Sequence, residues 1–274
     1  MQHIRKLFPG GKAKAFNVTY DDGVLQDIPF VRLLNQYGIK GTFHLNSRLM
    51  EEGFAWVHEK GLIIRRLPPD LAVSLYHGHE IASHTATHPY LAQLSEEAIL
   101  AELREDKEKL EQWFGCQVHG FAVPFDFYSD RIASCVQACG FAYSRISEES
   151  RSFAPQRDYY RWRSGIFHLN DGLQDFVRNF LATDQELAIC QIVGHSYDLD
   201  AENRWDMLEE IFRVISRAPD VLPMTAFDLI DYLQAMEGAQ ITQAGIFNPS
   251  HRDLWFGIDG RTLVVKAHQC LSWS

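Results

Sequence analysis

Short apolar runs alternate with longer amphipathic segments along most of the chain. The first apolar run covers 15–20, and a helical pattern follows over 27–37 until Gly38 ends it. Strands that alternate with helices in this way predict an α/β fold with a parallel sheet. The predicted strands lie at 15–20, 41–45, 80–83, 120–123, 141–144, 187–193 and 222–224, and the predicted helices at 27–37, 71–76, 95–113, 129–139, 204–217 and 225–237.

The longest predicted helix carries a run of charged residues from Glu102 to Lys109. Glutamate and lysine are spaced there to interact across successive helical turns. We therefore predict that this run forms a solvent-exposed face.

The pattern changes after Gly238. Two short, largely apolar segments at 253–258 and 262–267 flank the Asp259-Gly260 pair, which predicts a β-hairpin with an Asp-Gly turn. We therefore expect a main domain over residues 1–238 and an accessory β element over 239–274.

Composition narrows the class of protein. With 274 residues and 46% hydrophobic content, the chain can bury one large core. A formal net charge of −10 and the absence of a strong basic cluster argue against a nucleic-acid partner. The N-terminal residues predict neither a signal peptide nor a membrane-spanning helix, and five irregularly spaced cysteines agree with a reducing compartment. We expect a cytoplasmic protein without membrane contact, and the sequence does not indicate its oligomeric state.

Candidate chemistry is concentrated in two short segments. Asp21 and Asp22 end the first apolar run, and His84 and His88 lie four residues apart downstream. Two imidazoles and one carboxylate can hold a divalent ion while the second carboxylate takes a proton from bound water. Each segment also has a simpler interpretation, because Asp-Asp-Gly often forms a turn and a histidine pair can arise by chance.

Four segments in order resemble a known family. They are Thr19–Gly23, Ser83–His88, Phe121–Phe125 and Ile192–His195. Their pattern is similar to that of polysaccharide deacetylases, the NodB-homology domains of carbohydrate esterase family 4. The resemblance implies a distorted (β/α) barrel over most of the chain, to which the predicted C-terminal hairpin is a small appendage.

The resemblance also implies roles for individual residues. Asp22, His84 and His88 would hold one divalent metal ion, with zinc favoured by two imidazoles and one carboxylate. Asp21 would be the catalytic base, and His195 would be the general acid that protonates the leaving amine.

The chain departs from the family pattern in two places. Ala122 stands where the family usually has an arginine that orients the catalytic aspartate, and the expected Asp-x-x-Asp-Trp motif is missing. In the nearest candidate segment, Arg161 could replace that arginine or Trp162 could line a pocket for the acyl methyl group. A surface arginine beside a core tryptophan is the alternative. The backbone N–H near Phe125, where family members usually have tyrosine, would hold the oxyanion.

These observations predict a metal-dependent hydrolase that acts on carbon–nitrogen bonds other than peptide bonds. Its substrate would be an N-acylated, most simply N-acetylated, amino sugar or glycan. One alternative is a hydrolase of a linear or cyclic amide that is not a sugar. A second alternative is a sugar-binding module without catalysis, which the missing arginine motivates.

Overall fold

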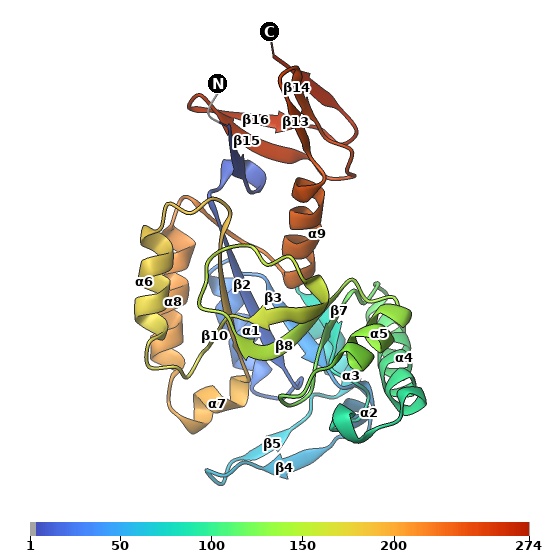
Figure 1. Cartoon of the computed structure of the whole chain (residues 1–274). Coiled ribbons are helices and arrows are strands. Elements are labelled where there is room, and N and C mark those ends of the chain that lie inside the picture. Colours follow the sequence, from blue (N-terminus) through green and yellow to red (C-terminus); the bar gives the residue numbers. More distant parts are fainter. Residues whose placement is uncertain (1–3, 274) are drawn as a thin grey trace.

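The computed structural model describes residues 4–273, and its centre is a parallel sheet of nine strands (Figure 1). The strands are β2 (Lys14–Asp21), β3 (Gly41–Leu45), β6 (Glu80–Ser83), β7 (Gly120–Ala122), β8 (Tyr143–Glu149), β9 (Trp162–Ser164), β10 (Ile166–Phe167), β11 (Ala188–Gly194) and β12 (Val221–Pro223). Their order is β10-β11-β2-β3-β6-β7-β8-β9, and β12 pairs with the start of β2.

The sheet nearly closes on itself. Only Gly165 separates β9 from β10, so one continuous segment supplies both ends of the strand order. Gln191 of β11 bridges the closure, because its side-chain oxygen accepts the Gly165 N–H at 3.0 Å and the Trp162 indole N–H at 3.3 Å. The predicted distorted α/β barrel is therefore confirmed.

Helices cover the outside of the barrel (Figure 1). They are α1 (Asp27–Gln36), α2 (Ser47–Glu51), α3 (Pro69–Leu75), α4 (Glu96–Phe114), α5 (Asp130–Ala138), α6 (Leu173–Ala182), α7 (Ser196–Ala201), α8 (Trp205–Arg217) and α9 (Ala226–Glu237). Ser95 caps α4 by accepting the Ala98 N–H, and Gly115 ends it with a φ of 63°.

The alternation of side chains along β2 separates the core from the site. Phe16, Val18 and Tyr20 belong to the apolar core, and Tyr20 stacks on Phe30 of α1 with ring centroids 3.9 Å apart. Successive side chains of a strand point to opposite faces, so Asp21 faces the barrel interior. The interior is polar at this end, where buried Thr19 precedes the aspartate by two positions.

Small β elements lie at both ends of the barrel (Figure 1). The predicted C-terminal hairpin is present as β15 (Leu254–Ile258) and β16 (Arg261–Val265), and β1 (Ile4–Leu7) adds an antiparallel third strand to it. A second small sheet, not predicted, contains β13 (Gln240–Thr242), β14 (Gly245–Phe247) and β17 (Cys270–Ser272). Both sheets pack beyond α9, and an unpredicted hairpin of β4 (Ala55–Val57) and β5 (Ile63–Arg65) projects from the opposite end.

Within residues 4–273, no helix is both long enough and apolar enough to span a bilayer. The cytoplasmic location stays a prediction.

Candidate active site

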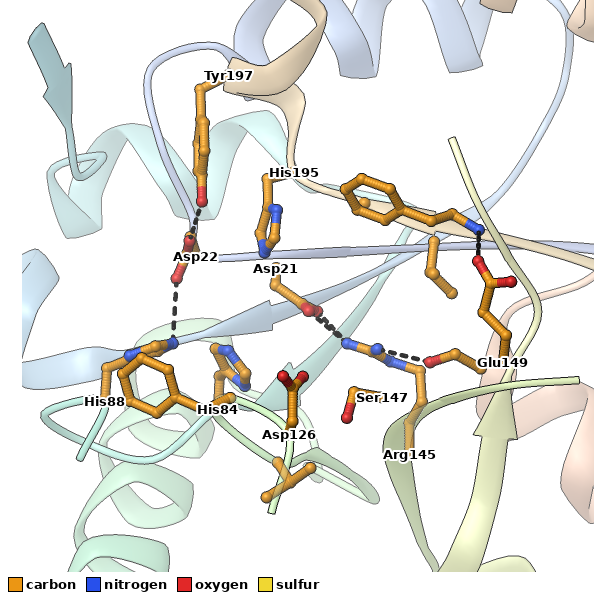
Figure 2. Close-up of a pocket in the computed structure, with 16 residues that line it drawn as sticks. Asp21, Asp22, His84, His88, Asp126, Arg145, Ser147, Glu149, His195 and Tyr197 are labelled. Carbon is orange, nitrogen blue, oxygen red and sulfur yellow. Dashed lines mark hydrogen bonds and ion pairs between the residues drawn. The ribbon is translucent and has the colours of Figure 1, made fainter. Parts of the chain in front are cut away.

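The predicted catalytic and metal-binding residues meet at the carboxyl ends of the barrel strands. Asp21 is the last residue of β2, His84 follows β6, and His195 follows β11. Together with Asp22 and His88 they line a cavity of about 400 Å³, and Figure 2 shows their side chains converging there. Barrel enzymes gather their chemistry at this end of the sheet.

Asp22, His84 and His88 form a cluster that suits a metal ion, because one ligand atom from each lies within 4.8 Å of the others. Burial lowers the pKa of both imidazoles to about 4, so both are neutral and able to ligate at pH 7. His84 donates from Nδ1 to the Ala122 carbonyl at 2.8 Å, which leaves its Nε2 free for a metal.

The carboxylate of Asp22 is held by two neighbours. Arg66 Nη1 lies 2.8 Å from Oδ1, and the Tyr197 hydroxyl donates to Oδ2 at 3.1 Å. Burial raises the pKa of Asp22, but the Arg66 guanidinium, together with the nearby histidines, brings this pKa well below its usual value. One ionised carboxylate and two neutral imidazoles are a donor set that fits a zinc-type divalent ion.

Asp21 has different partners from its neighbour. Arg145 of β8 reaches both carboxylate oxygens at 2.5 Å, and His44 of β3 places Nδ1 3.0 Å from Oδ1. Burial raises the pKa of Asp21, but Arg145, with help from His84 and His44, brings this pKa well below its ordinary value. Asp21 is therefore ionised and fixed in orientation, as a general base requires.

Arg145 supplies a guanidinium to Asp21 from β8, whereas β7 has Ala122 at the position of the expected arginine. In the parallel pairing of β7 with β8, Ala122 and Arg145 are direct partners. The guanidinium therefore reaches Asp21 from the neighbouring strand, one strand farther along the barrel.

The predicted roles of Arg161 and Trp162 are wrong. Arg161 pairs with Asp130 and Asp158 at the surface, away from the cavity. Trp162 is buried and bonds to Gln191 at the barrel closure, so it cannot line an acyl pocket. The alternative interpretation, a surface arginine beside a core tryptophan, is the one that the structure supports.

His195 is linked to a chain of buried polar groups. Its Nδ1 lies 3.0 Å from Asp198 Oδ2, the same oxygen lies 3.4 Å from His168 Nε2, and Tyr20 bonds to His168 Nδ1 at 2.6 Å. Burial alone would lower the pKa of His195, but the hydrogen bond to Asp198 and the nearby Asp21 and Asp22 raise this pKa to about 9. His195 therefore carries a proton at neutral pH, as a general acid requires.

Phe125 lies at the cavity in a strained backbone conformation. Its φ is 60°, and Asp22, Thr85 and His88 also have positive φ values. These residues account for half of the eight non-glycine positive-φ residues of the described chain, and such strain is common at functional sites. The predicted oxyanion contact of the Phe125 backbone N–H stays a prediction.

Several site residues were missed by the sequence analysis, although weak signals were present. Arg145 follows the predicted strand 141–144 directly, and the strand in fact continues to Glu149. His44 lies in a predicted strand and pairs in register with Asp21. Asp198 follows His195 by three residues, within reach across one helical turn.

Comparison with known proteins agrees with this architecture. Residues 9–144 match the family model described as polysaccharide deacetylase. A putative polysaccharide deacetylase from Mycobacterium smegmatis is similar in structure, with a TM-score of 0.61 and 15% identity over 86% of this chain and 96% of that one. The family 4 carbohydrate esterase from Streptomyces lividans, solved with acetate, gives a TM-score of 0.52 and 14% identity over 75% of this chain and 91% of that one. No curated protein matches by sequence.

A further structural relative is a mutant of a family 4 pseudoenzyme with restored activity, with a TM-score of 0.52 and 14% identity over 82% of this chain and 70% of that one. The barrel and the site together define the class of NodB-type α/β barrels. Residues 9–144, just under half of the chain, are similar to the polysaccharide deacetylase family, and the fold is that of solved family 4 carbohydrate esterases.

Proposed function

We propose that this protein is a metal-dependent hydrolase that removes an N-acetyl group from an amino sugar or glycan. One observation carries the proposal: the two adjacent aspartates have different neighbours. Asp22 faces two neutral imidazoles, whereas Asp21 is held by Arg145 and kept off the cluster. A metal ligand and a free base side by side are what hydrolysis of an unactivated amide needs.

The chain's own residues supply the proton transfers. An ion held by Asp22, His84 and His88 would lower the pKa of a bound water and polarise the amide carbonyl. Asp21 accepts a proton from the attacking water as the carbon–oxygen bond forms. His195 gives its proton to the nitrogen as the carbon–nitrogen bond breaks, so that a neutral amine and acetic acid are formed. The acid then ionises to acetate, and Asp21 loses and His195 regains a proton by exchange with solvent.

Both groups are in the required protonation state at neutral pH. The low pKa of Asp21 keeps it ionised, and a pKa of about 9 keeps His195 protonated. Ala122 replaces the family arginine, and this absence motivated a non-catalytic interpretation. Arg145 compensates for it by binding Asp21.

The surroundings of the cavity favour a neutral sugar. Exposed Phe125 lies at the cavity, and a second space of about 380 Å³ adjoins it, lined by Phe54 and Trp56 of the β4–β5 hairpin region. The arginines that line the two spaces, Arg145 and Arg66, are already paired with Asp21 and Asp22. Aromatic rings with few free charges suit the apolar faces of pyranose units, and the second space has room for a neighbouring unit.

Acetate release tests the proposal. Zinc-loaded protein is assayed with N-acetylglucosamine, with its β-1,4 oligomers of increasing length, and with small linear and cyclic amides. We expect turnover of the sugars, rising with chain length. Asp21→Asn should keep one metal per chain and lose about 10²- to 10⁴-fold in rate, whereas His84→Ala and His88→Ala should lose metal as well.

Turnover of the small amides alone would move the assignment to the non-sugar alternative. Stoichiometric metal without turnover of any substrate would instead favour a binding module. Loss of metal in Asp21→Asn would mean that the two aspartates have exchanged roles.

A further inference from the structure

The segment between the two metal-ligating histidines has no helical hydrogen bonds of its own. His84 follows the end of β6, and the chain then runs irregularly to His88, with positive φ values at Thr85 and His88. A helix would fix two histidines four residues apart on one face. In this loop, other parts of the molecule must fix them.

Helix α4 supplies part of that support through two carboxylates one helical turn apart, while Asn46 donates to the His84 and Thr85 carbonyls. Asp106 is fully buried, and its Oδ2 accepts the Ser83 hydroxyl at 2.6 Å and, at 3.2 Å, the His84 N–H, which also donates to the Leu45 carbonyl at 2.8 Å. Glu102 accepts the Thr87 N–H at 2.9 Å and the Thr87 hydroxyl at 2.7 Å. The two carboxylates therefore bind the loop at both ends, at His84 and at Thr87, the residue before His88.

This arrangement corrects the prediction that the charged run of α4 is a solvent-exposed face. Residues 104 and 108 of the run are exposed, but Asp106 is wholly buried and Glu102 is half-buried against the loop. Asp106 also accepts the Ser47 N–H at 2.7 Å, so it ties β6 and α2 to α4 at the same point. Burying a carboxylate is costly unless several donors satisfy it, and here three donors do.

We propose that Glu102 and Asp106 form a carboxylate clamp that positions His84 and His88 for metal binding before the ion arrives. They are positioning residues, since neither belongs to the Asp22, His84 and His88 cluster. Groups that orient metal ligands typically contribute 10- to 100-fold to affinity. The clamp rests on the metal site proposed above and explains how an irregular loop can serve as a preformed half of it.

Zinc affinity of the metal-free protein tests the clamp, measured by competition with a chromophoric chelator. Glu102→Ala should weaken binding about 10-fold or more because Thr87 loses both acceptors. Glu102→Gln should bind nearly as tightly as wild type, because its amide oxygen still accepts the Thr87 N–H. Glu108→Ala, an exposed position of the same helix, is the matched control and should leave affinity unchanged.

Asp106→Asn provides a second test, because a single amide oxygen cannot accept from both the His84 N–H and the Ser47 N–H, which bind different oxygens of the carboxylate. We expect weaker zinc binding, with circular dichroism and thermal unfolding showing that the metal-free variant is folded. Thr87→Val should weaken binding less than Glu102→Ala, and adding it to Glu102→Ala should cost nothing further, since both changes break the same contact.

Wild-type zinc affinity in Glu102→Ala would overturn the clamp. Equal losses in Glu102→Ala and Glu102→Gln would also overturn it, since they would assign the effect to charge. The failure of the metal site is a separate result, because the wild-type protein would then bind no zinc at all.

Discussion

Asp21 and Asp22 are chemically identical side chains that receive different tasks from their neighbours. Asp21 ends β2 and points to the barrel interior, while Asp22 takes a φ of 87° and turns its carboxylate toward the histidines. Each aspartate has its own arginine: Arg145 pairs with Asp21, the proposed base, and Arg66 pairs with Asp22, the proposed metal ligand. The two guanidiniums keep both carboxylates ionised in this buried site. A buried carboxylate without a cationic partner would favour its neutral form.

Arg145→Met removes the charge that holds Asp21 while keeping similar length. We expect the pKa of Asp21 to rise, because burial would no longer be opposed by the guanidinium. The acidic limb of the pH–rate profile should shift upward and the rate should fall about 10²-fold, while metal content stays at wild-type level. Arg161→Met, at a surface ion pair, is the control and should leave the profile unchanged. A shift in Arg161→Met and none in Arg145→Met would reverse this assignment.

Local signals in the sequence were sufficient for most strands and helices. The strands at 41–45 and 80–83 and the helices predicted to begin at Ser95 and Thr225 are confirmed, and both residues cap their helices, because hydrophobic period and capping chemistry act over a few residues. Arg145 was missed because it depends on which strand pairs with which, a long-range property that periodicity does not carry. The β4–β5 hairpin was missed for a related reason, since its apolar residues Val57 and Ile63 are exposed and show no core-facing pattern.

The barrel closes at the junction of β9 and β10, and this closure depends on a single glycine. Gly165 packs against β11 so closely that a Cβ there would lie 1.8 Å from the Gln191 carbonyl oxygen. Backbone cannot yield as a side chain can, so Gly165→Ala should lower the free energy of unfolding by about 3 kcal/mol. Urea unfolding measures this change. Gly257→Ala, whose added Cβ would meet its nearest neighbour at 3.5 Å, is the control and should change stability little. Equal stability of the two variants would mean that the closure at β11 is looser than the structure describes.

The barrel and the C-terminal β element are joined through α9, and one half-buried carboxyl group lies where α9 begins on the barrel. Glu80 of β6 accepts hydrogen bonds from Thr42 of β3 at 2.8 Å, from Tyr143 of β8 at 2.9 Å and from the Phe227 N–H of α9 at 2.9 Å. Burial raises the pKa of Glu80 to about 7 despite these donors. The joint is therefore sensitive to pH in the neutral range.

Because the pKa of Glu80 is higher in the folded than in the unfolded chain, its contribution to stability is full at low pH and is lost as pH rises to about 7. Wild-type protein should lose on the order of 2 kcal/mol of unfolding free energy from this group between pH 5 and pH 8. Asp27 and Asp106, with pKa values raised to about 7 and about 6 by burial, act in the same direction. Glu80→Gln removes the titrating proton: its amide oxygen can still accept from Thr42 and the Phe227 N–H, and its amide nitrogen can donate to the Tyr143 hydroxyl oxygen. Urea unfolding at pH 5, 6, 7 and 8 should therefore give a flatter dependence than wild type. Glu108→Gln, at an exposed position, should reproduce the wild-type slope. An equally steep slope in Glu80→Gln would show that Glu80 does not titrate in this range.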